Sequence, residues 1–190
     1  MRVDIDYLRK SLLDRWSKDD MDLLAEQIME CENLKDVYML SKDTEPKLVF
    51  RSAWLLQKVC EKDLNRVETF LDLLLNDFDR IENHSAFRSY AKIISMLLSR
   101  RAMGTLSDRL IAILSEEKNV ERIIEGCFNY IIKEKRIISV ISHCCDILSY
   151  YAKDKDWIRE QLLIESDKML VNGSAASVVC SRRLKERLKS

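Results

Sequence analysis

The chain has 190 residues, of which 32 are basic and 32 acidic, and 47% of it is apolar. Three glycines and one proline are too few for the tight turns of a β-sandwich or barrel, or for the glycine-rich phosphate loop of a Rossmann or P-loop protein. We therefore expect an all-α protein with one hydrophobic core, and its zero net charge disfavours a dedicated polyanion binder.

Apolar residues recur at the spacing of an α-helix almost from one end of the chain to the other. Within residues 1–43, this spacing predicts a first helix over about 4–16, a second opened by a capping box of Ser17 and Asp20, and a short third after Asn33. These helices are expected to form an N-terminal cap.

The middle of the chain predicts two pairs of helices. The first pair is a helix over about 44–62, with its proline tolerated in the first turn, and a helix capped by Asp63. The second pair is a helix over about 85–101 and, after a stop at Gly104, a helix capped by Thr105.

The C-terminal part predicts four more helices. Asn119 is expected to cap the first, the second covers about 136–153, and the third covers about 156–171. Gly173 separates the third from a last helix over about 174–189, which is expected to cap the C-terminal end. In total, we expect about nine to eleven short helices.

One helix pair repeats along the sequence. Phe50-Arg51-Ser52 opens the first helix of one pair and recurs as Phe87-Arg88-Ser89 in the next, 37 residues later. A weaker third copy begins near Ile141. A period in the high thirties with two helices per unit resembles the HEAT and armadillo class of α-solenoids, over about residues 44–170. An irregular bundle with a chance repeat remains the alternative.

Within that class the chain resembles the small bacterial HEAT-like proteins that carry no recognised catalytic motif. The resemblance implies an α-α superhelix built as a single helical-repeat domain over residues 1–190. It also implies that stacked helix pairs leave an extended concave surface formed by the second helix of each pair.

The cysteines and histidines offer no metal or catalytic motif. His143, Cys144 and Cys145 are adjacent, so on a helix they point about 100° apart, and no Cys-x-x-Cys pair completes a site. His84 lies at a helix start, where a polar residue is expected. We therefore expect no cofactor, and we expect the cysteines to be free and buried. They are Cys31, Cys60, Cys127, Cys144, Cys145 and Cys180.

Two other patterns are weighed against function. Gly173-Ser174-Ala175-Ala176 lacks most of the serine-rich loop of the fumarase and adenylosuccinate lyase superfamily, so a lyase is disfavoured. Glu116 and Glu117 fall at the C-terminal end of a predicted helix, where carboxylates are mildly unfavourable, and we interpret them as an ordinary solvated turn.

Two features bear on nucleic-acid binding. Residues 181–190 carry five basic side chains and one acidic side chain, which we interpret as complementing the dipole of the last helix. Trp16, Trp54 and Trp157 fall on apolar stripes, so we expect them in the core rather than stacked on bases. A HEAT-like DNA-binding or DNA-repair protein remains the alternative function.

The leading hypothesis is a cytoplasmic, non-catalytic protein that binds a protein or peptide on the concave face of a helical solenoid. The chain shows no signal-peptide pattern at its start and no apolar run of the roughly 18 residues that cross a membrane. The sequence leaves the partner and the oligomeric state open. The candidate contact residues lie off the apolar stripe on the second helices and are Arg66, Thr69, Asp72, Asp108, Arg109, Arg159 and Glu160.

Overall fold

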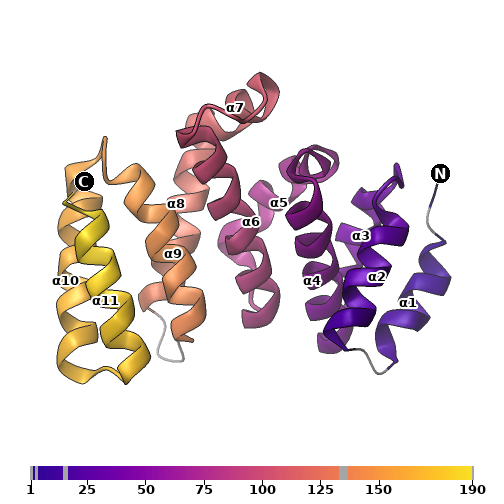
Figure 1. Ribbon diagram of the computed structural model, residues 1–190, viewed down its shortest axis with the longest axis horizontal. Coiled ribbons are helices and arrows are strands. Elements are labelled where there is room, and N and C mark those ends of the chain that lie inside the picture. Colours follow the sequence, from indigo (N-terminus) through magenta and orange to yellow (C-terminus); the bar gives the residue numbers. More distant parts are fainter. Residues whose placement is uncertain (1, 3, 15–16, 133–136, 190) are drawn as a thin grey trace.

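The computed structural model describes residues 2, 4–14, 17–132 and 137–189, and this part of the chain contains helices and no strand (Figure 1). Helix makes up 81% of the described residues, which confirms the all-α prediction. In chain order, the elements are α1 (Ile5–Leu13), α2 (Lys18–Ile28), α3 (Leu34–Leu40), α4 (Pro46–Lys62), the 3₁₀ helix η1 (Leu64–Thr69), α5 (Leu71–Asp77), the 3₁₀ helix η2 (Phe78–Arg80), α6 (His84–Ala102), α7 (Asp108–Ser115), α8 (Glu117–Ile132), α9 (Ile138–Tyr151), α10 (Asp156–Asn172) and α11 (Ala175–Arg187).

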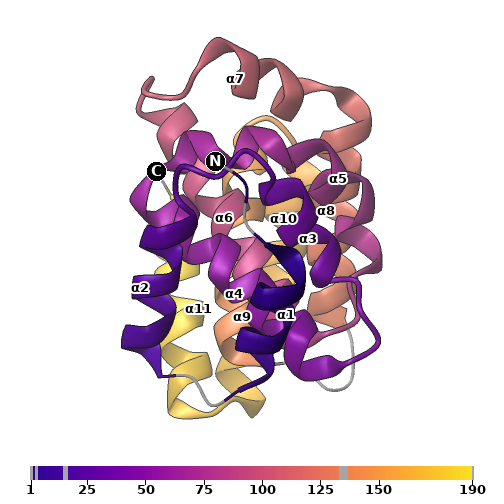
Figure 2. The same cartoon turned by 90° about the vertical axis from the view of Figure 1, so that its right-hand side faces the viewer.

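The helices stack side by side in two rows along the long axis of the molecule (Figures 1 and 2). In the first row α2, α4, α6, α9 and α11 each contact the next. In the second row lie α3, α5, α8 and α10, while α1 packs on α3 and α4 at the N-terminal end. Helix α7 lies beyond the ends of both rows, at the top of Figure 1. Helix α10 packs chiefly on α9 and α11 of the first row.

Several helix starts agree with the sequence. The predicted capping box is confirmed, because the Ser17 hydroxyl accepts from the Asp20 amide at 3.1 Å and the Asp20 carboxylate accepts from the Ser17 amide at 2.8 Å. At the other end Ser174 accepts from the Ser177 amide and caps α11. Gly104 follows α6 with φ of +66°, a left-handed conformation that favours glycine at a helix end.

Three predicted caps are wrong in detail. Asp63 caps the 3₁₀ helix η1 rather than an α-helix. The single helix predicted after Asp63 is broken at Phe70, whose buried ring stacks on Tyr38, and α5 begins only after this residue. Ser107, not Thr105, caps α7. Asn119 lies inside α8, where its buried amide donates to the Ile113 carbonyl at 2.8 Å and ties α7 to α8.

The buried apolar side chains form one continuous cluster. At its centre the Phe87 ring lies between Phe78 and Tyr130, with ring centroids 4.9 Å from each. Gly126 of α8 faces this stack, and a Cβ atom there would lie 2.7 Å from Phe78 Cδ1. The glycine therefore allows α8 to approach η2 closely, which sets the position of α8 in the second row.

The six cysteines are free and buried, as predicted. The tryptophan prediction is only partly correct. Trp16 lies outside the described residues. Trp54 is half-buried and stacks on Phe50, but Trp157 is 51% exposed, so its core placement is wrong. No helix in the described ranges is both long and apolar enough to span a bilayer.

Candidate functional site

Two of the predicted contact residues serve the fold. Arg66 is half-buried on η1, and its guanidinium donates to the Cys31 carbonyl, which ties η1 to the connection between α2 and α3. Thr69 donates to the Arg66 carbonyl at 3.0 Å, a bond within the same short helix. Asp72 is exposed on α5.

The remaining predicted contact residues lie on two separated helices. Asp108 and Arg109 are on α7, beyond both rows, and Arg109 approaches Glu68 at 3.7 Å. Arg159 and Glu160 are exposed on α10, at the far end of the array. The structure therefore distributes the seven residues over η1–α5, α7 and α10 and does not gather them on one surface.

The histidine and cysteine cluster lies on α9. Burial, followed by the nearby charges of Lys92 and Arg88, lowers the pKa of His143 to about 4, so its imidazole is neutral at pH 7 and is a weak base. Burial also raises the pKa of the Cys144 thiol. This pair lacks the activation that a nucleophilic thiol needs. Among the described residues, no three His, Cys, Asp or Glu side chains gather closely enough to hold a metal ion.

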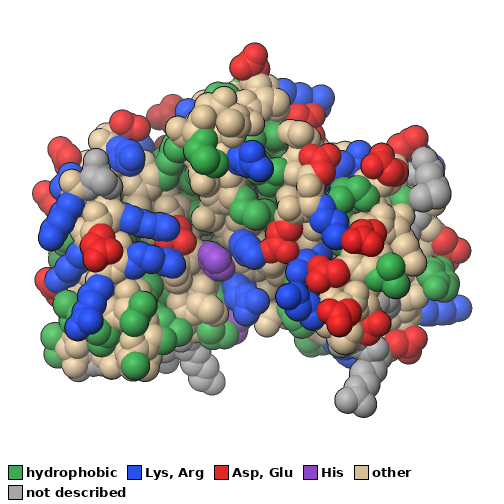
Figure 3. Space-filling view, in the orientation of Figure 1, with side chains coloured by type: hydrophobic (Ala, Val, Ile, Leu, Met, Phe, Trp, Pro, Cys, Tyr) green, Lys and Arg blue, Asp and Glu red, His purple; other side chains and the backbone are tan. Residues whose placement is uncertain are grey.

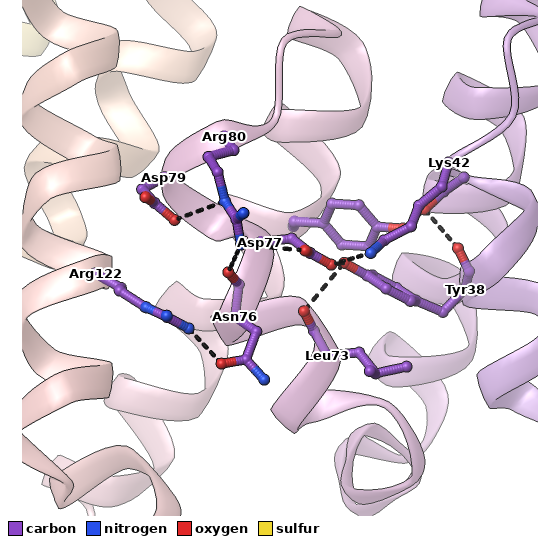
Figure 4. Close-up of polar contacts among 10 residues, drawn as sticks. Tyr38, Lys42, Leu73, Asn76, Asp77, Asp79, Arg80 and Arg122 are labelled. Carbon is purple, nitrogen blue, oxygen red and sulfur yellow. Dashed lines mark hydrogen bonds and ion pairs between the residues drawn. The ribbon is translucent and has the colours of Figure 1, made fainter.

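One concave region, of about 560 Å³, lies between α3, η2 and the start of α6 (Figure 4). Asp77 is its central charged group and accepts from the Tyr38 hydroxyl at 2.7 Å and from Lys42 at 2.5 Å, with Arg80 at 3.6 Å. Burial opposes ionisation of Asp77, but these hydrogen bonds and cationic charges outweigh it and hold its pKa below the usual value. The polar groups around Asp77 satisfy one another, so this network serves the fold.

Acidic and basic side chains on the face of the first row also pair with one another. Lys58 of α4 pairs with Asp22 of α2 at 2.9 Å and with Glu61 at 3.3 Å, and Glu61 pairs in turn with Lys92 of α6. These pairs link three neighbouring helices, and Figure 3 shows acidic and basic side chains interspersed over this part of the surface.

The basic C-terminal end is partly compensated by carboxylates of the chain itself. On α11, Arg183 and Arg187 both pair with Asp146 of α9, and Lys185 pairs with Asp167 of α10 at 2.7 Å. These cations therefore hold α11 against its neighbours. This supports their interpretation as structural charges.

A groove of about 720 Å³ runs between α8 and α10 and has a different character. Its apolar side chains on α8 are Val120, Ile124 and Phe128, which recur every four residues and share one face of the helix. The opposite face of α8 carries buried residues such as Gly126 that pack on η2 and α9. The full lining is Glu117, Val120, Glu121, Ile124, Glu125, Phe128, Asn129, Lys155, Trp157 and Gln161.

The aromatic pair in the groove is incompletely buried. Trp157, in the first turn of α10, stacks on Phe128 of α8 with ring centroids 5.6 Å apart and an interplanar angle of 29°. Half of the Trp157 surface remains exposed. Such a ring keeps a large apolar area available for a partner at little cost in side-chain entropy, and tryptophan is enriched at the centres of protein interfaces.

Three carboxylates follow the groove along α8. Glu117, Glu121 and Glu125 are exposed and one helical turn apart. Glu117 lies in the first turn of α8 and not at the C-terminal end of a helix as the sequence predicted, so the macrodipole favours its charge. Lys155 is the one cation of the lining, which makes the groove acidic as well as apolar.

Sequence reasoning missed this groove because it assigned Trp157 to the core. The available signal was the double pattern on α8, where a row of glutamates runs beside a row of apolar residues. Periodicity alone cannot show whether a neighbouring helix covers that apolar row. No family model, no curated protein and no solved structure matches the chain.

Proposed function

We propose that the chain is a non-catalytic binding protein of the HEAT-like α-solenoid type, which holds a protein or peptide partner in the groove between α8 and α10. The observation that carries this proposal is the half-exposed Trp157, stacked on Phe128 in the floor of the groove. Helices α8 and α10 provide the two walls, and a binding role requires no reactive side chain.

The exposed side of α10 supports the same function. Trp157, Ile164 and Val171 are spaced seven residues apart, lie on one side of the helix, and are 51%, 47% and 80% exposed. The opposite side of α10 is also apolar, with Ile158 and Leu162 fully buried. A helix that is apolar on both sides at the end of an array is typical of a surface that a partner covers.

The arrangement also supports the solenoid type. Successive helices alternate between two rows over much of the chain, and each helix of the first row contacts mainly its neighbours. The Phe50 and Phe87 repeats open α4 and α6, which are adjacent members of that row. The proposed contact surface lies between α8 and α10. It differs from the predicted surface, which also included η1, α5 and α7.

The test is selection of peptides from a random displayed library on the immobilised protein, followed by affinity measurement with Trp157→Ala. Truncating a central interface tryptophan is expected to weaken binding by at least about tenfold. The matched control is Tyr7→Ala, which removes an aromatic ring of similar exposure on α1, at the other end of the array. Equal loss with both variants, or selected peptides that bind Trp157→Ala as tightly as the wild type, would count against the groove.

A further inference from the structure

The second row is interrupted at the groove between α8 and α10. In this row α3 contacts η1, and α5 contacts α8, so neighbours lie against each other. Helix α10 packs chiefly on α9 and α11, and the groove separates it from α8. The Phe128 and Trp157 rings meet across the groove, so a helix laid along α8 over this pair would contact both α8 and α10.

Three carboxylates along the groove stand against one cation, Lys155, in its lining. Glu117, Glu121 and Glu125 have no ion-pair partner within the described ranges, whereas Glu61 and Asp77 elsewhere are paired with lysines. Like charges one turn apart repel one another along a helix. Their repeat of about 6 Å matches the spacing of side chains one turn apart on a second helix lying alongside.

Resting on the proposed function, we propose that the occupant of this groove is a cationic amphipathic helix. Its apolar side would lie against Phe128 and Trp157, and lysines or arginines one turn apart would face Glu117, Glu121 and Glu125. Burial of the apolar side provides affinity, and the acidic row selects a basic partner over an acidic one.

The experiment measures binding of three labelled synthetic peptides of about 18 residues, enough for five helical turns, by fluorescence anisotropy. The first is an amphipathic helix with lysines on one flank of its apolar side. The second has the same apolar side and glutamates in place of the lysines, and the third has the composition of the first with central prolines that break the helix. We expect the first to bind at least about tenfold more tightly than either of the others, and its affinity to fall as salt rises.

Charge reversal on the protein tests the acidic row directly. Glu121→Lys/Glu125→Lys alters two exposed side chains and is expected to reverse the preference, so that the acidic peptide binds more tightly than the basic one. The matched control, Glu30→Lys/Glu82→Lys, changes the same number of exposed charges outside the groove and should leave the preference unchanged.

The outcomes separate this inference from the function on which it rests. Equal binding of the acidic or proline-containing peptide, still lost with Trp157→Ala, would overturn the cationic helix and leave the groove as a binding site. Failure of the three peptides together with a library selection that yields no Trp157-dependent binder would overturn both. Self-association of the protein that Trp157→Ala abolishes, with no peptide binding, would identify a second copy as the occupant and overturn the inference.

Discussion

At the scale of single residues, the structure separates charges that hold the fold from charges that remain available. Asp77 accepts from Tyr38 and Lys42 and joins α3 to α5, while the glutamates of α8 contact no cation within the described residues. Both kinds of residue are acidic and helical in the sequence. The difference arises from what the neighbouring helix places opposite them.

The Asp77 network predicts a defined acid sensitivity. The folded state lowers the pKa of Asp77, so its contribution to stability is complete above the unfolded pKa of about 4 and is lost as pH falls through the lower, folded value. Asp77→Asn should therefore cost about 1–3 kcal/mol at pH 7, and the difference from wild type should shrink below about pH 4. Urea denaturation across this pH range measures it.

Asp72→Asn, on the exposed side of the same helix, is the control and should change stability by less than about 0.5 kcal/mol. A difference between wild type and Asp77→Asn that stays constant from pH 7 to pH 3 would show that the carboxylate charge plays no part in holding α3 to α5.

At the scale of elements, close approach decides where a helix lies. Gly126 brings α8 against Phe78, and the exposed side of α8 then forms one wall of the groove. A larger residue at this position has to displace either the Phe78 ring or the helix.

We expect Gly126→Ala to destabilise the protein. The added methyl group would lie 2.7 Å from Phe78 Cδ1 and 3.1 Å from the Phe78 carbonyl oxygen, and such overpacking costs about 1–3 kcal/mol. The higher helix propensity of alanine offsets about 1 kcal/mol of that cost. Chemical denaturation of Gly126→Ala beside Lys118→Ala, an exposed site on the same helix, measures the net effect. A variant more stable than the wild type by about 1 kcal/mol, the full gain in helix propensity, would show that α8 shifts without loss.

Helix positions and their apolar faces followed from the sequence over most of the chain, because period and caps are local properties. The Ser17 capping box and the Ser174 start are examples. The break at Phe70 was missed because it depends on a ring buried against Tyr38. The start of α8 was predicted at Asn119 instead of Glu117, because the amide of Asn119 bonds the Ile113 carbonyl in place of capping a helix. The groove was missed for the same physical reason, since the exposure of Trp157 depends on where α10 packs.

At the scale of the whole molecule, much of the positive charge at the C-terminal end is paired within the fold. The net charge is zero, and the basic end on α11 is partly paired with Asp146 and Asp167. Affinity for nucleic acid depends on cations that can replace the counterions of phosphates. Cations already paired within the fold contribute little to that exchange.

Binding to duplex or single-stranded DNA should therefore be no tighter than about 10⁻⁴ to 10⁻⁶ M at physiological salt, the range of non-specific contact. Replacing Arg182, Arg183 and Arg187 together by glutamine should leave peptide binding in the groove unchanged. Anisotropy titrations with DNA and with peptide measure both quantities. Submicromolar DNA binding that the triple variant abolishes would favour the nucleic-acid function instead.

The contact pattern of the two rows has a consequence for how the molecule responds to a partner. Because α10 and α11 are attached to the rest mainly through α9, this end can open without unfolding the middle of the array. A ligand that contacts both α8 and α10 would hold α10 in place and make this opening less frequent. Its binding free energy would then appear as slower hydrogen exchange in α11, a helix that contributes no residue to the groove.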